Sequence, residues 1–401
     1  MMQFQLPRNS PTLYKYLYCS SYEGDNFPHA YISCSLSYYL NDIKKRIDSR
    51  EMSWDVYKKY TNSYEYIHSV VPGKKKGVAK LKPLSRSYFK MIELMQFFKL
   101  LENYDNKPIR SFHLAEGPGG FIEALAHVRR NKSDSYVGMS ILDDVQDPNI
   151  PGWRKSRQFL DEHKNVFIEV GKDKTGDILS EENFHYVNEK YGGTMELITG
   201  DGGFDFSIDF NNQEHNIGKL LFGQIAYAVV MQKRGGHFVL KIFDSFMAHT
   251  IDLLALLSSL YEKVYITKPQ TSRIANSEKY IVCKHFIGPS HQELFRSLLP
   301  TFQSMLSNEK AHVFRFLNIP LSLLFMTKVE EYNSIFGQQQ VENIHYTLSL
   351  VDNKHNRDDK LNALLRQNVK KCIDWCVKHN VTHNIINLNT NVFLNNEDIV
   401  R

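Results

Sequence analysis

The sequence predicts an α/β fold built on a mostly parallel central sheet, and two observations support that prediction. Short apolar strand patterns alternate with helical patterns between residues 111 and 285. Charged residues directly follow several of the predicted strands, at the edge where open α/β sheets bind ligands. The composition agrees, because 42% hydrophobic residues in a 401-residue chain exclude wholesale disorder.

The elements are expected in the following order along the chain. Residues 1–60 are rich in Tyr and Ser with weak helical periodicity, which predicts an N-terminal helical extension. A loop is predicted over 70–83, and a helix that is apolar on both sides, and therefore buried, begins at Ser85. Strands are predicted over 111–115, 136–141, 166–170, 195–199, 237–243, 263–267 and 280–285, and helices over 121–129, 217–233 and 248–261. Gly235 and Gly236 are expected to end the second of these helices, and from residue 290 the pattern becomes helical.

The positive charge is concentrated in one segment. Residues 58–90 hold nine basic residues against a single acid, Glu65, so the segment nets +8 and the rest of the chain −3. Nearby Tyr and Phe residues could stack bases while the lysines hold phosphates. The alternative is a solvated surface loop, and charge alone does not decide between the two.

Two sequence features indicate a reactive site at the sheet edge. A Gly-rich turn at 117–120 lies between a strand and a helix, where a ligand can approach the backbone, although the spacing is not the dinucleotide pattern G-x-G-x-x-G. Lys241 stands in an otherwise apolar strand, where a charge needs a partner or a function. If the last strand is antiparallel, four charged residues meet at one edge: Lys90, Asp201, Lys241 and Glu278.

These stretches resemble FtsJ-like ribose 2′-O-methyltransferases, and within them the cap-specific mRNA type. The matching stretches, in order, are SRSYFKMIEL (Lys90), HLAEGPGGFIEAL, GDIL (Asp177), ITGDGGFD (Asp201), GGHFVLKIFD (Lys241) and KPQTSRIANSEKYIVCK (Glu278). The resemblance implies a Rossmann-like methyltransferase fold, seven-stranded and mostly parallel with the last strand antiparallel. It places a methyltransferase domain at 61–288, between the helical extension at 1–60 and a mainly helical accessory region at 289–401.

The activity that the resemblance implies is S-adenosylmethionine-dependent methylation of a ribose 2′-hydroxyl in RNA, favouring the first transcribed nucleotide of capped mRNA. Lys241 would be the general base of a Lys-Asp-Lys-Glu tetrad, and Asp201 and Glu278 would orient the two lysines. A base must be neutral when it acts, and burial beside a second cation favours the neutral amine. No metal is needed, because the methyl donor carries its own positive charge.

The resemblance also implies the residues that bind cofactor and RNA. Cofactor contacts carry over to Glu116, Gly117, Pro118, Gly119, Gly120, Phe121, Asp177 and Asp201. Glu116 replaces a smaller residue of relatives. The residues near Ser140–Leu142 would line the adenosine; no acid stands at that strand end for the ribose, although Asp143 and Asp144 follow closely. Residues expected at the RNA are Lys74, Lys75, Lys76, Arg86, Ser272 and Arg273.

Two other functions stay open: methylation of a different RNA such as ribosomal RNA, and an idle RNA-binding scaffold subunit. Expected partners are RNA and other capping or transcription proteins, with no membrane. The start lacks a secretory signal and the five cysteines lack framework spacing, so an intracellular site is expected, cytoplasmic or nuclear. Lys, Asn, Ile and Tyr are frequent, as in an AT-rich genome; for a large DNA virus the site would be the host cytoplasm or the virion.

Four Cys and His residues near the C-terminus are of types that bind zinc, but we interpret them as residues of the core or the surface. Cys372, Cys376, His379 and His383 would form one stripe on a single helix. Such a stripe is about 16 Å long, so its four side chains cannot converge on one zinc ion.

Overall fold

The computed structural model describes residues 1–24, 28–105, 107–142, 152–203, 212–353 and 357–387. Contacts divide the chain into a larger unit, residues 1–46 and 83–342, and a smaller unit, residues 47–82 and 343–401. These boundaries differ from the expected ones after residues 60 and 288, because each unit is built from two separate stretches of chain. The basic segment 58–90 is consequently divided between the two units.

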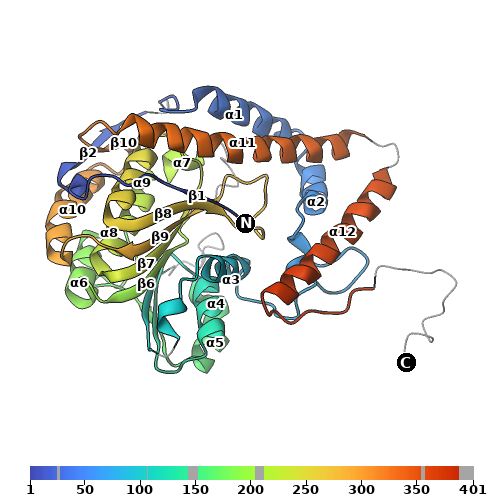
Figure 1. Cartoon of the computed structure of the whole chain (residues 1–401), viewed down its shortest axis with the longest axis horizontal. Coiled ribbons are helices and arrows are strands. Elements are labelled where there is room, and N and C mark those ends of the chain that lie inside the picture. Colours follow the sequence, from blue (N-terminus) through green and yellow to red (C-terminus); the bar gives the residue numbers. More distant parts are fainter. Residues whose placement is uncertain (25–27, 106, 143–151, 204–211, 354–356, 388–401) are drawn as a thin grey trace. The chain divides into compact units, whose positions relative to one another are not determined.

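An eight-stranded sheet forms the centre of the larger unit, in the order β1-β8-β9-β7-β6-β3-β4-β5 (Figure 1). The strands are β1 Met2–Gln5, β3 Arg110–Leu114, β4 Ser135–Met139, β5 Val166–Glu169, β6 Met195–Gly200, β7 Gln232–Ile242, β8 Tyr261–Lys268 and β9 Lys279–Phe286. Strands β3 to β7 are parallel neighbours, and β9 runs antiparallel to both β7 and β8. The seven predicted strands and the antiparallel last strand are therefore confirmed.

The N-terminal region contains the expected helices together with two strands that the sequence pattern did not predict. Residues Met2–Gln5 form β1, which pairs antiparallel with β8 at the edge of the central sheet. Farther on, β2 Leu17–Tyr22 pairs with β10 His312–Leu317 in a separate two-stranded sheet. The three strands β1, β2 and β10 have only four to six residues each. They are too short to show a clear alternation of apolar and polar residues in the sequence. The expected helical part of this region is confirmed by α1 Cys34–Asp48 and α2 Glu51–Thr61.

Helices cover both faces of the sheet (Figure 1). On one side lie α3 Ser87–Phe97, α4 Gly120–Arg129 and α5 Arg157–Glu162; on the other lie α6 Glu181–Tyr191, α8 Gly218–Met231, α9 Ala248–Leu260 and α10 His291–Leu306. Helices α8 and α9 are buried on nearly every side and fill the core. Shorter helical elements are η1 Leu13–Tyr16, η2 Glu65–Ile67, η3 Glu102–Tyr104, η4 Trp153–Ser156 and α7 Gln213–Asn216, and a long helix, α11, covers Leu323–Asp352.

Helix α8 ends at Met231, four residues before the expected glycine stop. Gln232 already pairs with Met195 of β6, and its side-chain amide donates to the Met195 carbonyl over 2.8 Å. Gly235 has a φ of +80° and lies inside β7, where it accompanies a register shift between β6 and β7. The two glycines therefore lie in the irregular first part of β7 and do not end helix α8.

The smaller unit is helical at its centre. Helix α12 Arg357–Lys378 buries Val369, Cys372, Trp375 and Cys376 and packs against α2 and η2. His383 lies beyond the end of α12, where it pairs with Ala79 in a β-bridge, so the expected single stripe does not form. In the described part of the chain, no three His, Cys, Asp or Glu side chains gather closely enough to hold a metal ion.

None of the helices in the described ranges is both long and apolar enough to cross a membrane.

Candidate active site

Two ion pairs lie at the carboxyl edge of the central sheet. Lys90 of α3 places its Nζ 2.7 Å and 2.8 Å from the two carboxylate oxygens of Glu278. Lys241, near the end of β7, places its Nζ 3.3 Å from Oδ1 of Asp201 and 2.6 Å from the Asp201 carbonyl oxygen. All four side chains are only 12% to 16% exposed. The four residues expected at one edge are thus brought there.

The strand register explains why these side chains meet. Asp201 follows β6, and its N–H donates to the carbonyl of Leu114 in β3, which fixes the chain as it leaves the sheet. Lys241 pairs directly with Tyr280 across the antiparallel β7–β9 ladder. Because β9 runs against β7, its beginning lies beside the end of β7 and carries Glu278 to the same edge.

Tyr280 links the two ion pairs. Its hydroxyl donates to Oδ1 of Asp201 over 3.3 Å, and its ring centroid lies 6.0 Å from the Nζ of Lys90. The side chain is fully buried. Burial, reinforced by the charges of Asp201 and Glu278, raises the pKa of the phenol well above its ordinary value, so it remains a hydrogen-bond donor.

The electrostatics of the site favour an ionised Glu278. Burial opposes its charge, but the ammonium groups of Lys90 and Lys241 outweigh burial and lower the pKa of Glu278 to about 2. Lys268, at the end of β8, donates to the Glu278 carbonyl over 2.6 Å. Burial lowers the pKa of Lys268 to about 7, against the opposing effect of the Glu278 carboxylate. The site therefore contains a third lysine, and its burial disfavours the charged form.

The glycine turn between β3 and α4 packs closely against its surroundings. Gly119 has a φ of +101°, which favours glycine, and a Cβ on Gly120 would lie 2.1 Å from Oγ of Ser85. The buried Glu116 accepts the Phe121 N–H at Oε1 over 2.8 Å, while its Oε2 has no hydrogen-bond partner among the described residues. Burial, and secondarily Asp201, raises the pKa of Glu116 well above its usual range. An unpartnered carboxyl oxygen beside an accessible backbone turn fits a small polar ligand.

Asp177 lies on a second turn at the same edge. Gly176 has a φ of +70°, and a Cβ there would lie 2.1 Å from the Ser140 carbonyl, so the turn packs against the residues that follow β4. Oδ1 of Asp177 accepts the N–H of Leu179 over 2.8 Å, which leaves its second carboxylate oxygen for another partner. Asp177 and the residues that follow β4 therefore lie close together, and their contact with the cofactor stays a prediction. Asp143 and Asp144 lie outside the described residues.

The residues predicted at the RNA do not share one environment. Lys74, Lys75 and Lys76 are exposed and belong to the smaller unit, whereas the half-buried Arg86 and Arg273 belong to the larger unit. Ser272 is only 4% exposed, and its hydroxyl donates to Oε1 of Glu278 over 2.8 Å. Its side chain therefore supports the tetrad, and its contact with RNA stays a prediction.

Sequence reasoning missed three residues around the tetrad: Glu93, Lys268 and Tyr280. Glu93 lies one helical turn after Lys90, and a buried acid on the same face was a detectable signal. Lys268 and Tyr280 flank Glu278 within the stretch KPQTSRIANSEKYIVCK, but only the folded loop shows what they contact.

Comparison with known proteins identifies the family. The model of the FtsJ-like methyltransferases matches residues 83–286, which include the whole tetrad and both turns. The chain belongs to the FtsJ-like methyltransferase family. The methyl donor that fits this family is S-adenosylmethionine. The glycine turn, Glu116 and Asp177 remain the residues predicted to hold it.

Two curated relatives of this FtsJ-like chain are cap-specific mRNA (nucleoside-2′-O-)-methyltransferases. Methyltransferase 2 of Danio rerio is 29% identical over 331 residues, which cover 79% of this chain and 43% of the relative. Methyltransferase 1 of Trypanosoma brucei brucei is 30% identical over 246 residues, which cover 59% of this chain and 64% of the relative. The chain therefore spans less than half of the first relative and less than two thirds of the second.

Proposed function

We propose that this chain transfers the methyl group of S-adenosylmethionine to a ribose 2′-hydroxyl in capped mRNA, at the first transcribed nucleotide. The observation that carries the proposal is the pairing of Lys90 with Glu278 and of Lys241 with Asp201 at the carboxyl edge of the sheet. The relatives named cap-specific mRNA methyltransferases support the choice of capped mRNA.

Lys241 is the residue suited to take the proton of the hydroxyl. Its Nζ is held by both the carboxylate and the carbonyl of Asp201, so a neutral amine keeps its orientation by donating to them. The lone pair of that amine can then accept the 2′-hydroxyl proton as the oxygen attacks. Bound S-adenosylmethionine supplies an electrophilic methyl group.

Lys90 and Glu278 have a different task in this proposal. Their close ion pair keeps one positive and one negative charge beside Lys241, so the site can hold a substrate oxygen as its negative charge develops. Tyr280 donates to Oδ1 of Asp201, the same oxygen that the Lys241 ammonium contacts. The chain's own residues therefore provide the base, its orientation and charge balance.

Charge supports RNA binding by the smaller unit. Residues 47–82 and 343–401 hold 16 Lys and Arg against 10 Asp and Glu, a net charge of +6, which leaves −1 for the larger unit. The exposed Lys74, Lys75 and Lys76 form no recorded ion pair with described residues. Such cations suit phosphates without selecting a base sequence.

The proposal is tested by methyl transfer to short RNAs of identical sequence, capped and uncapped. We expect transfer to the capped RNA, and none when its first transcribed nucleotide is a 2′-deoxynucleotide. Equal transfer to capped and uncapped RNA contradicts the cap requirement. Transfer to neither, with S-adenosylmethionine bound in calorimetry, contradicts methylation of mRNA altogether and favours another RNA or a scaffold role.

A further inference from the structure

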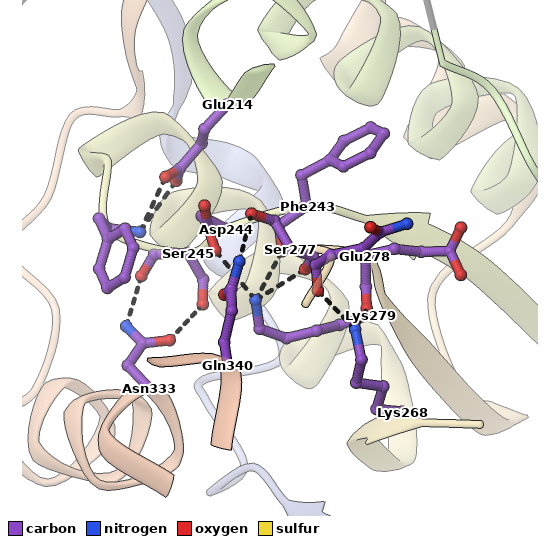
Figure 2. A network of polar contacts seen from close by, with 12 residues as sticks. Glu214, Phe243, Asp244, Ser245, Lys268, Ser277, Glu278, Lys279, Asn333 and Gln340 are labelled. Atoms are coloured by element: carbon purple, nitrogen blue, oxygen red, sulfur yellow. Dashed lines mark hydrogen bonds and ion pairs between the residues drawn. The ribbon is translucent and has the colours of Figure 1, made fainter. Parts of the chain in front are cut away.

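The loop between β8 and β9, residues 269–278, is held from outside by side chains of several elements. Glu93 of α3 accepts the N–H groups of Gln270 and Thr271 over 2.7 Å and 2.8 Å. In α11, Gln340 donates to the Ala275 carbonyl over 2.9 Å. Figure 2 shows Gln340, Lys268 and Lys279 converging on the end of this loop. Side chains from α3, α11 and both flanking strands therefore contact the loop at its two ends.

Glu93 anchors the start of the loop. It is only 2% exposed, so its carboxylate has lost its hydration and depends on the hydrogen bonds that it accepts. It lies one turn after Lys90 on α3, so the helix that brings Lys90 to Glu278 also holds the other end of the loop. Helix α3 therefore sets the distance between Lys90 and the start of the loop.

Lys268 anchors the end of the loop. Its Nζ donates to the carbonyl oxygens of Asn276 and Glu278, each over 2.6 Å. Both acceptors are backbone atoms, so this contact fixes the path of the chain into β9 and leaves the Glu278 carboxylate to Lys90 and Ser272.

We propose that Glu93 and Lys268 are positioning residues that hold the 269–278 loop as a preformed wall of the RNA site, with Glu278 set against Lys90 before RNA arrives. The proposal rests on the proposed function and deepens it, because it assigns the placement of the tetrad acid to two residues outside the tetrad. A loop that RNA binding had to order would cost affinity, and these anchors remove that cost.

The first test follows the loop without RNA or cofactor. In Glu93→Gln the side-chain NH₂ group replaces one of the two carboxylate oxygens and faces a backbone N–H of the loop, so one hydrogen bond is lost. Hydrogen exchange of the backbone amides over residues 270–278 should therefore accelerate at least tenfold. Glu196→Gln is the matched control, because Glu196 accepts the Arg110 N–H over 2.9 Å at the opposite edge of the sheet. Its exchange over 270–278 should equal that of the wild type. Unchanged exchange in Glu93→Gln overturns the proposal.

The second test asks whether Glu93 acts through Glu278. Glu93→Gln should lower kcat/KM for capped RNA at least tenfold, but less than threefold when introduced into Glu278→Gln. Equal losses in both backgrounds overturn the positioning role. Lys268→Met should behave as Glu93→Gln does in both tests. If wild-type protein methylates no RNA, the proposed function fails, while the exchange measurement still decides whether the loop is held in this way.

Discussion

The Nζ of Lys241 lies 3.3 Å from the carboxylate and 2.6 Å from the backbone carbonyl of the same residue, Asp201. One residue thus offers two acceptors to the lysine, one charged and one neutral. The carbonyl contact does not depend on the ionisation of the carboxylate, so it can keep the amine in place while the charge of the site changes. The orientation of Lys241 is therefore fixed by the turn after β6 as well as by its ion pair.

Replacing Lys241 separates catalysis from cofactor binding. Lys241→Met keeps the aliphatic stem and removes the amine, so methyl transfer should fall by about 10²–10⁴-fold, the range for loss of a general base. Affinity for S-adenosylmethionine, measured by calorimetry, should stay within threefold of the wild type. Lys263→Met, at an exposed position in β8, is the control. More than a tenth of wild-type activity in Lys241→Met would remove it from the role of base.

Tyr280→Phe tests the link between the ion pairs. The variant loses the hydroxyl that donates to Asp201 and keeps the buried ring. A hydrogen bond to a charged group contributes about 1.5–3 kcal/mol, so kcat should fall by about tenfold or more. Tyr261→Phe loses an equally buried hydroxyl that donates to Gln232 over 2.9 Å, far along the sheet, and should retain its kcat. Similar losses in both variants would point to general destabilisation.

The sheet was predictable because its strands are apolar runs separated by helices, a pattern that is local in sequence. Strand β1 was not predictable, because the segment MQFQ becomes a strand only by pairing with β8, more than 250 residues away in the sequence. Asp201 and Lys241 were predictable from their positions after and within strands, whereas Lys90 lies on α3 and Glu278 just before β9. Glu93 stood out as an acid in a helix predicted to be buried, but its role could not be predicted, because its partners, Gln270 and Thr271, are backbone groups of a distant loop and leave no mark on the sequence.

The two compact units were not visible in the sequence for a related reason. Charge marked residues 58–90 as one segment, but packing separates its first part from Arg86 and Lys90. The smaller unit joins residues 47–82 to the C-terminal helix α12, whose buried face includes Cys372 and Trp375. A linear composition profile cannot show that two stretches separated by residues 83–342 share a core.

Gly176→Ala should weaken cofactor binding without unfolding the chain. The substitution places a Cβ 2.1 Å from the Ser140 carbonyl and requires a φ of +70°, so the turn that carries Asp177 must move. The strain is about 1–3 kcal/mol, and affinity for S-adenosylmethionine should drop at least tenfold. Gly152→Ala, where a Cβ meets nothing within 4 Å, is the control. Equal affinities for both variants would exclude the Asp177 turn from the cofactor site.

His113 should make the chain less stable in mild acid. The ring is fully buried in β3, and its two nitrogens lie 2.8 Å from the hydroxyls of Ser111 and Thr199. Burial lowers its pKa from 6.5 to about 3. Between these values the unfolded chain binds a proton that the folded chain does not, so the free energy of unfolding falls as pH falls, by up to about 1.4 kcal/mol per pH unit.

His113→Gln isolates this contribution, because a glutamine can bond both hydroxyls but does not titrate. Denaturant unfolding of the two proteins should give free energies whose difference is constant above pH 7. As pH falls from 6.5 toward 4, the wild type should lose stability more steeply than the variant, because only the wild type carries His113. Other buried groups such as His249, with a pKa of about 4, titrate in both proteins and do not change the difference. Parallel pH profiles would mean that the folded protein accepts a proton on His113. In that case the His113 side chain would be placed to pair with the Glu116 carboxylate, whose Oε2 lies 3.6 Å from its Nδ1, and the cofactor edge would hold an ion pair in place of two neutral groups.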